Sequence, residues 1–398
     1  MSAAAPDRSL QTIEAKLDAG ERLDAADGVA LFATPDLMQL GRLANRVRRN
    51  KHGDTAFYNV NQHLNYSNVC ILSCKFCEFQ RKPGQDGAYT FELEQIAHKG
   101  RDAQARGATE MHIVGGLHPK LPWDYYLNML RTLKREAPKL HLKAFTAVEV
   151  VHLAKVSKRA IRKDFEAGVR SLLEELRDAG LDSLPGGGAE VFDDRVHKEA
   201  WRGKIRSDEW LTVHRVAHEL GLFTNATMLY GHLESHANRV EHLIKLRAEQ
   251  DHALEQGFPA RFQCCIPLPF FPDGSALQHL PGPTGLDNLR TLAVARLMLD
   301  NIDHVKAFWI MQTLPMAQVM LDFGANDVDG TVVWYDITKV GGASTHQEVT
   351  VDRMRRAIRE AGYTPIERDT LYRPVERHGI DWRVADSSGS LPPQPIPA

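Results

Sequence analysis

TAFYNVNQHLNYSNVCILSCKFC, residues 55–77, is a short apolar run followed by three closely spaced cysteines. Residues 56–61 have the length and composition of a buried strand. Cys70, Cys74 and Cys77 follow the strand with gaps of three residues and then two. In parallel α/β barrels the reactive groups lie on loops after the strands. We therefore expect the cysteines to lie beyond the carboxyl end of a first strand.

The cysteine spacing predicts an iron–sulfur cluster with one open coordination position. A loop of this kind can turn three thiolates toward one centre, and thiolates are the soft ligands that such clusters require. A cluster that only transfers electrons normally has four protein ligands. Three ligands leave one iron free for the amino and carboxylate groups of S-adenosyl-L-methionine (SAM). We predict a [4Fe–4S] cluster that cleaves SAM to an adenosyl radical, with Phe76 beside these cofactors.

A zinc site is the alternative interpretation of the three cysteines. Structural zinc normally has four ligands, and His52, His63 or His98 could supply the fourth. Cys264 and Cys265 are different, because neighbours on a predicted strand face opposite sides. Core packing is expected for at least one of them.

Beyond the cysteines, short apolar runs alternate with amphipathic helices, which is typical of a parallel sheet covered by helices. One expected helix follows Ser207 as N-cap and ends before Gly221, and another follows Thr350 and ends before Gly362. Further strands are expected at residues 111–114, 140–146, 223–228, 261–267, 305–310 and 331–337, with another near Ala189. Seven or eight such steps predict an α/β fold, a TIM-type (β/α) barrel that is complete or nearly so.

The chain is divided into three parts by these patterns. Leu10, Ile13 and Leu17 recur at helical spacing, so residues 1–54 are expected to form an N-terminal helical extension. Residues 55–384 are assigned to the barrel with its C-terminal elements. Residues 385–398 are rich in Ser, Gly and Pro, and we expect a disordered tail.

Composition excludes several classes of protein. The 398 residues carry a net charge of −2, with 43% hydrophobic and 25% charged residues. This balance argues against a nucleic-acid partner. No stretch approaches the roughly 18 apolar residues that span a membrane, and no secretory signal is recognisable. We expect a cytoplasmic protein, in which clustered cysteines are more often metal ligands than disulfides.

Two glycine-containing loops are candidate SAM-binding segments. Gly115 and Gly116 end the strand at residues 111–114 and can bring backbone groups close to the SAM amino group; a plain tight turn is the alternative. Three glycines precede Glu190, whose carboxylate could accept hydrogen bonds from the ribose, and Arg195 could pair with the SAM carboxylate. The alternative there is a flexible connection with a surface Glu–Arg pair.

The chain resembles the aminofutalosine synthase family of radical SAM enzymes over about residues 9–373. The segments that carry the resemblance are GGLHP at 115–119, KAFTAVE at 143–149, LPGGGAE at 184–190, TNATMLYGH at 224–232 and ERDTLY at 367–372. The resemblance implies that the adenosyl radical adds to the enol-ether double bond of 3-[(1-carboxyvinyl)oxy]benzoate. The products would be 6-amino-6-deoxyfutalosine, for menaquinone biosynthesis, methionine, and carbon dioxide or bicarbonate. An electron donor such as flavodoxin or ferredoxin is also implied.

The implied substrate has two carboxylates and needs hydrogen-bond donors. His118, Asn225, His232 and Arg296 are the candidates. Asn225 and His232 follow one strand toward the expected barrel mouth, although core or loop groups with satisfied hydrogen bonds are the alternative. No general acid or base is assigned, because bound SAM would carry the chemistry.

Two segments depart from the family pattern. Phe271 stands where a histidine is expected, and Trp334, Tyr335, Asp336, Ile337 and Lys339 stand where acidic residues and a histidine are expected. The resemblance therefore does not assign substrate contacts to residues of the late strands. Two other classes compete with the synthase: a related barrel that abstracts hydrogen, such as dehypoxanthine futalosine cyclase or a subunit of the deazaflavin-forming synthase, and a non-catalytic iron–sulfur or zinc protein.

Overall fold

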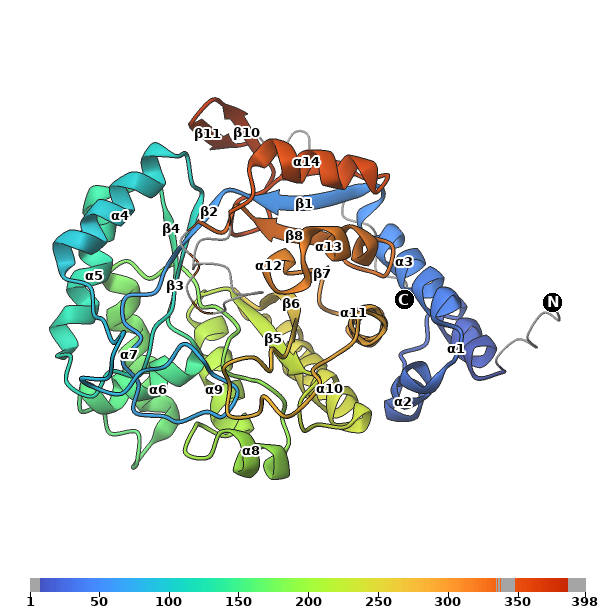
Figure 1. Cartoon of the computed structure of the whole chain (residues 1–398), viewed down its shortest axis with the longest axis horizontal. Coiled ribbons are helices and arrows are strands. Elements are labelled where there is room, and N and C mark those ends of the chain that lie inside the picture. Colours follow the sequence, from blue (N-terminus) through green and yellow to red (C-terminus); the bar gives the residue numbers. More distant parts are fainter. Residues whose placement is uncertain (1–7, 334, 336, 338–347, 386–398) are drawn as a thin grey trace.

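The computed structural model describes residues 8–333, 335, 337 and 348–385, in which helices surround a barrel of strands (Figure 1). The strands are β1 Thr55–Asn59, β2 Asn61–Leu64, β3 Glu110–Ile113, β4 His141–Ala144, β5 Thr224–Tyr230, β6 Phe262–Pro269, β7 His304–Val305, β8 Asp327–Gly330, β9 Thr364–Glu367, β10 Val375–His378 and β11 Asp381–Val384. The helices are α1 Arg8–Asp18, α2 Ala25–Ala33, α3 Leu37–His52, α4 Leu93–Ala105, α5 Trp123–Glu136, α6 Ala147–Val156, α7 Phe165–Asp178, α8 Asp194–Ala200, α9 Ser207–Glu219, α10 His236–Glu255, α11 Gly285–Met298, α12 Trp309–Gln312, α13 Leu314–Leu321 and α14 Val351–Glu360. The predicted tail at residues 385–398 lies outside the described residues except for Ala385, and Trp334, Asp336 and Lys339 also lie outside them.

The barrel closes through eight parallel strand positions. β2, β3 and β4 form one ladder, and β5, β6 and β7 form another. Residues 183–184 occupy the position between these ladders, because they bridge to Lys143 of β4 and to Thr224 of β5. On the other side Lys306 bridges to Asp327 of β8, and β8 pairs with β1, which leads into β2. The predicted TIM-type barrel is confirmed.

Two predicted strands, one near Ala189 and one over residues 305–310, differ from the observed ones. The described chain forms no strand near Ala189; residues 183–184 take that place in the barrel. The strand predicted over residues 305–310 ends at Val305, and Trp309 begins α12. An apolar run alone does not separate a buried strand from a buried helical turn, and here it contains both.

The strand predicted over residues 331–337 lies earlier, at β8, whose sequence Asp-Val-Asp-Gly is polar. Both aspartates are nevertheless buried in the barrel. Asp327 pairs with Arg368 at 2.6 Å, and Asp329 pairs with Lys306 at 3.1 Å. Apolar patterning missed this strand because its burial depends on ion pairing with distant residues.

Amphipathic helices cover the outside of the strands. In α9 an apolar stripe of Trp210, Val213 and Ala217 is buried, although the N-cap is Arg206 and the predicted N-cap, Ser207, is the first helical residue. In α14 the Thr350 hydroxyl accepts a hydrogen bond from the Arg353 amide, as expected of an N-cap.

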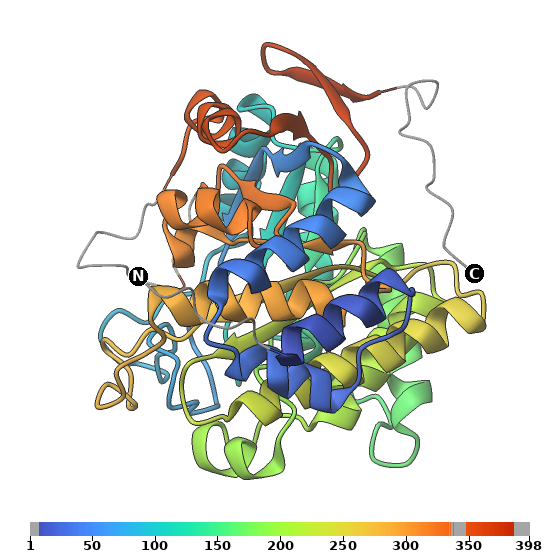
Figure 2. The same ribbon diagram turned by 90° about the vertical axis from the view of Figure 1, so that its right-hand side faces the viewer.

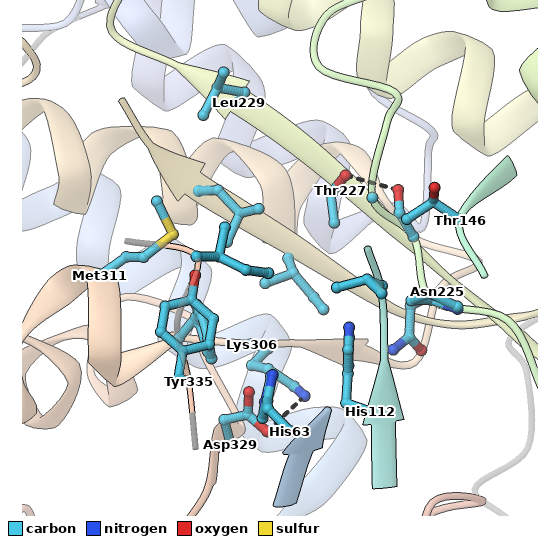
Figure 3. A pocket seen from close by; sticks show the side chains of 18 of the residues that line it. His63, His112, Thr146, Asn225, Thr227, Leu229, Lys306, Met311, Asp329 and Tyr335 are labelled. Carbon is cyan, nitrogen blue, oxygen red and sulfur yellow. Dashed lines mark hydrogen bonds and ion pairs between the residues drawn. The ribbon is translucent and has the colours of Figure 1, made fainter. Parts of the chain in front are cut away.

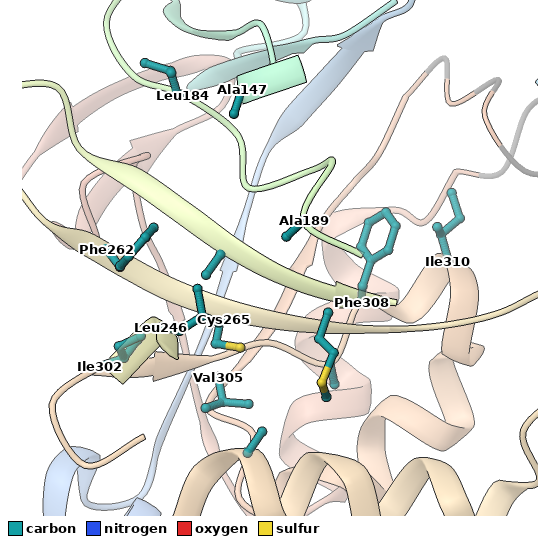
Figure 4. Close-up of a cluster of buried hydrophobic side chains, with 14 of the residues drawn as sticks. Ala147, Leu184, Ala189, Leu246, Phe262, Cys265, Ile302, Val305, Phe308 and Ile310 are labelled. Carbon is teal, nitrogen blue, oxygen red and sulfur yellow. The ribbon is translucent and has the colours of Figure 1, made fainter. Parts of the chain in front are cut away.

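The layer between strands and helices is a continuous apolar core, part of which appears in Figure 4. Phe262 and Cys265 of β6 lie in it with Leu246 of α10 and Val305 of β7. Cys265 is fully buried there, as predicted for at least one cysteine of the adjacent pair. Burial of apolar surface contributes roughly 25 cal/mol per Å². Most of the fold's stability therefore resides away from the cysteine loop.

Helices α1, α2 and α3 cover one side of the barrel (Figure 2). α3 packs against α11, and α2 packs against α10. Asp24 and Asp36 cap α2 and α3, since each side chain accepts a hydrogen bond from an amide of the first turn. No helix in the described ranges is long and apolar enough to cross a membrane.

Candidate active site

The barrel encloses a cavity of about 250 Å³, seen from close by in Figure 3. This volume is several times the roughly 30 Å³ that one water occupies, so the cavity can hold a small organic molecule. Side chains from or next to the strands form a polar floor: His63, Glu110, His112, Lys143, Asn225, Lys306 and Asp329. An apolar wall includes Val114, Leu229, Ile266, Leu268, Phe308 and Met311. Loops after the strands form the rim with Phe76, Cys77, Glu190, Phe270 and Phe271.

Backbone hydrogen bonds fix the cysteine loop at the mouth of the barrel. The Gly116 amide, after β3, donates to the Ser67 carbonyl at 2.8 Å. Farther along, the Lys75 amide donates to the Ala200 carbonyl at the end of α8 at 2.8 Å. The Lys75 carbonyl accepts from the Ala276 amide, after β6, at 2.8 Å. Segments following three different strands therefore hold the loop.

The loop presents three free thiols at this end of the barrel. Cys77 lines the cavity, whereas Cys74 and Phe76 pack against an apolar cluster that includes Trp201. Cys70 is partly exposed. Among the described residues, no three His, Cys, Asp or Glu side chains gather closely enough to hold one metal ion. Thiolates that each bind a different iron of a cluster do not need to converge on a single point.

Gly115 and Gly116 are explained by close packing against the start of the cysteine loop. A Cβ at Gly115 would lie 2.6 Å from the Tyr66 ring, and one at Gly116 would lie 2.3 Å from the Val69 carbonyl oxygen. The Gly115 amide donates to Oε1 of Glu149 at 2.9 Å. Both glycine amides are bonded within the protein, so this turn positions the cysteine loop. The SAM amino group is a donor and would use the carbonyl groups here, so the predicted contact of Gly115 and Gly116 with SAM stays a prediction.

Glu190 lies at the rim with its backbone in the left-handed region, at φ 49°. It is 7% exposed and forms an ion pair with the buried Lys204. Lys204 Nζ lies 5.3 Å from the centre of the Phe76 ring, within cation–π range. Burial would lower the pKa of Lys204, but Glu190 and the thiols of Cys74 and Cys77 raise it above its ordinary value. Lys204 thus connects Glu190 with the cysteine loop.

Two buried ion pairs cross the floor. Lys143 Nζ lies 2.7 Å from Oε2 of Glu110, and Lys306 Nζ lies 3.1 Å from Oδ1 of Asp329. Burial would raise the pKa of Glu110, but Lys143, followed by Arg368 and Lys306, holds it well below its usual range. Glu110 therefore stays ionised, and each lysine of the floor lies against a carboxylate.

His63 of β2 and His112 of β3 stack beside these ion pairs. Their ring centres are 4.7 Å apart and their planes differ by 12°. Burial lowers the pKa of His63 to about 4, and it lowers the pKa of His112 well below its ordinary value. Both imidazoles are therefore neutral at neutral pH.

Comparison with known proteins shows what kind of barrel this is. Residues 64–246 match the radical SAM superfamily, and residues 259–379 match the CofH/MqnC C-terminal region. The chain is 42% identical to the aminodeoxyfutalosine synthase of Thermus thermophilus, covering 93% of this chain and 96% of the relative. It is 41% identical to that of Streptomyces coelicolor, covering 96% and 97%. The chain belongs to the aminodeoxyfutalosine synthase family of radical SAM enzymes.

Two further proteins are similar at lower identity. The 5-amino-6-(D-ribitylamino)uracil–L-tyrosine 4-hydroxyphenyl transferase of Methanopyrus kandleri is 35% identical, covering 90% of this chain and 94% of the relative. The crystal structure of methylornithine synthase has a TM-score of 0.68 at 17% identity and covers 89% of this chain and 97% of that chain, which shows a shared fold. Radical SAM enzymes use a [4Fe–4S] cluster and SAM, so both predicted cofactors are confirmed.

The residues predicted for the aminodeoxyfutalosine synthase site fall into two groups. Phe76, Cys77, Glu190 and Asn225 line the cavity. His118 is outside the lining, and its Nδ1 accepts hydrogen bonds from the amides two and three residues later, at 3.1 and 3.0 Å. Such bonds shape the loop after β3 and leave the imidazole away from the cavity.

His232 also lies outside the cavity lining. Its Nδ1 accepts a hydrogen bond from the Leu233 amide at 2.7 Å, which leaves Nε2 to donate to the Leu229 carbonyl at 3.0 Å. The ring packs edge-on against Trp201. His232 therefore packs behind the rim loops and does not face the cavity.

Neither predicted arginine faces the cavity. Arg195 of α8 is exposed and donates to the Leu233 carbonyl at 3.0 Å. Arg296 of α11 is fully buried and donates to the Gly324 carbonyl, the Asp303 carbonyl and Oδ1 of Asn326. These acceptors precede β7 and β8, at the amino ends of the strands, so the predicted contact with a substrate carboxylate does not fit the position of Arg296.

Sequence reasoning missed Lys143, Lys204, Lys306 and Asp329. The sequence carried a signal for Lys143. This lysine lies within a predicted barrel strand, and a charged side chain buried in a barrel requires a partner there. Lys204 carried no such signal, since its pairing with Glu190 depends on how the segment after α8 returns to the rim.

Proposed function

We propose that this chain joins the 5′-deoxyadenosyl group of SAM to the enol-ether carbon of 3-[(1-carboxyvinyl)oxy]benzoate within the cavity of Figure 3. The products are 6-amino-6-deoxyfutalosine, methionine, and carbon dioxide or bicarbonate, in menaquinone biosynthesis. Family membership supports the reaction. The observation that carries the site assignment is one cavity bounded by Phe76 and Cys77 at the rim and by polar groups at the floor.

Cys70, Cys74 and Cys77 are proposed to hold the cluster. Three free thiols on one loop match a cluster that keeps one iron open for SAM. When bound, the cluster supplies the electron that cleaves the sulfonium of SAM. Glu190 is proposed to accept hydrogen bonds from the ribose, and its ion pair with Lys204 holds this buried carboxylate at the rim.

The wall serves the reaction by excluding water. Ile266, Leu268 and Phe308 offer only carbon to the cavity, so a reactive double bond beside them is shielded from solvent and from side reactions. The floor supplies polar groups at the other end. An apolar wall above a polar floor suits a substrate with an apolar ring and a carboxylate.

A soluble electron donor such as flavodoxin or ferredoxin is proposed to supply the electron, in the cytoplasm. Exposed residues on the side of the cysteine loop that faces away from the cavity support this proposal. Ile71 is 50% exposed and Cys70 is partly exposed. A docked donor would come close to the loop without entering the barrel.

The test uses the full chain, reconstituted anaerobically with iron and sulfide, with dithionite, SAM and 3-[(1-carboxyvinyl)oxy]benzoate. Mass spectrometry should detect a product containing both the adenosine and the benzoate ring. Free 5′-deoxyadenosine with no such adduct would refute the proposal and favour a barrel that abstracts hydrogen.

A further inference from the structure

Two imidazoles on the cavity floor lack the hydrogen bonds that buried polar groups normally make. His63 is 3% exposed, and neither of its ring nitrogens has a partner in the described structure. His112, stacked on His63, is partly exposed, and it lines the cavity. Neither the His112 ring nor the Asn225 amide forms a side-chain hydrogen bond within residues 8–333. Figure 3 shows all three side chains around the same space.

The charged groups packed around the two histidines neutralise one another. Glu110 of β3 pairs with Lys143 of β4, and Asp329 of β8 pairs with Lys306 beside β7. The Tyr335 ring lies edge-on to His63 at 5.2 Å. Both lysines of the floor are thus already paired with carboxylates. The two histidines and Asn225 are N–H donors on the floor whose side chains form no hydrogen bond within the described residues.

We propose that His112 and Asn225 bind the ring carboxylate of a benzoate-class substrate, with His63 stacked behind His112 as a positioning residue. This inference rests on the proposed function and specifies which end of the substrate enters first. The ring carboxylate is retained in the product, whereas the enolpyruvyl carboxylate is lost. A subsite on the floor holds the retained group while the double bond lies nearer the rim.

The apolar wall between floor and rim matches the rest of such a substrate. Leu268 and Phe308 line the space above the polar groups, where a benzene ring would lie. A carboxylate beside His112 favours the imidazolium, which makes a charge-assisted hydrogen bond. Binding should therefore take up a proton.

Unpartnered histidine nitrogens also occur where no ligand can reach. His214 of α9 is fully buried, has both nitrogens unpartnered in the described ranges, and packs on Trp210 at 3.8 Å between ring centres. It is absent from the cavity lining. His112 differs because it reaches the cavity, and His214 is therefore the matched control.

Isothermal titration calorimetry of the full chain with benzoate and benzamide tests the subsite. The wild type should bind benzoate more tightly, with proton uptake revealed by buffers of different ionisation enthalpy. His112→Phe keeps a stacked ring without a donor and should weaken benzoate binding by about ten- to a hundred-fold, with little change for benzamide. Asn225→Ala should weaken benzoate binding less. His63→Leu removes the stacked ring, which itself lowers the pKa of His112, so benzoate binding should weaken while proton uptake persists. His214→Phe should bind like the wild type.

The outcomes separate this subsite from the proposed function. If His112→Phe and Asn225→Ala both bind benzoate like the wild type, or if the wild type does not prefer benzoate to benzamide, the subsite is refuted even when the adenosine adduct forms. If benzoate binding depends on His112 but no adduct forms with the enolpyruvyl compound, the subsite stands and the proposed reaction fails.

Discussion

The phenol of Tyr66 donates a 2.9 Å hydrogen bond to Oε1 of Glu149, and the Gly115 amide donates to the same oxygen at 2.9 Å. Glu149 is 2% exposed, and its Oε2 accepts from the amide and the hydroxyl of Thr146. One carboxylate at the start of α6 thus ties the chain that enters the cysteine loop to the turn after β3. Buried carboxylates are stable only with such donors.

Tyr66→Phe should lower the free energy of unfolding by about 1–3 kcal/mol, because a buried carboxylate loses a donor. Tyr126→Phe is the control. The Tyr126 hydroxyl is also buried but has no partner within the described residues, and its ring packs edge-on against Tyr66. Urea denaturation measures both. Equal losses would mean that the Glu149 bond contributes nothing.

Cys74→Ala should abolish most cluster loading while the barrel stays folded, because the apolar core lies between strands and helices away from this loop. Iron content and absorption of the anaerobically reconstituted protein measure loading, and circular dichroism measures folding. Cys265→Ala removes a thiol buried in the core and should load iron like the wild type. Full cluster content in Cys74→Ala would contradict the ligand assignment.

Lys204→Met should destabilise the protein by about 3–5 kcal/mol, because Glu190 would remain buried without its cation. Adding Glu190→Gln should restore part of this loss, as measured by urea denaturation. The control is Arg195→Ala. Arg195 pairs with Glu199 on the surface, and such pairs contribute about 0–1 kcal/mol. A loss in Lys204→Met no larger than the control's would show that the rim pair is unimportant.

The barrel and the cysteine loop could be predicted because their signals are local. The stripe of Trp210, Val213 and Ala217 follows helical spacing, and the three cysteines lie within eight residues. β8 could not be predicted in this way. Its aspartates are buried through Lys306 and Arg368, which are distant in the chain.

The sequence pattern also could not show where a residue lies along the barrel axis. Asn225 was expected to reach the substrate and lines the cavity. Arg296 was expected to do the same, but it lies where α11 meets the amino ends of β7 and β8. Helical periodicity does not show which end of the barrel a buried residue of α11 approaches.

Arg296→Met should reduce stability by about 3 kcal/mol or more without changing KM for the benzoate substrate. The guanidinium donates to Gly324 O at 2.8 Å, Asp303 O at 2.9 Å and Asn326 Oδ1 at 2.6 Å, and the buried acceptors of Gly324 and Asn326 would each lose a partner. Urea denaturation and steady-state kinetics separate the two effects. A raised KM with unchanged stability would instead restore Arg296 to the substrate site.

Buried histidines should make the fold sensitive to mild acid. Burial lowers the pKa of His218 and that of His242 to about 3, whereas an unfolded histidine titrates near 6.5. Below that value the unfolded chain binds more protons than the folded one, so stability is complete above pH 6.5 and falls as the pH drops toward 3. At pH 5.5 each such histidine should lower the free energy of unfolding by about 1.4 kcal/mol.

His218→Gln should remove one such contribution. Its loss of stability between pH 7.5 and pH 5.5, from urea denaturation at both values, should be smaller than that of the wild type by about 1.4 kcal/mol. His98→Gln is the control, because His98 is exposed on α4 and should leave the pH profile unchanged. If His218→Gln loses as much stability as the wild type over this range, the imidazole is not held neutral in the folded state. The acid sensitivity over this range would then have to come from other buried histidines, such as His242.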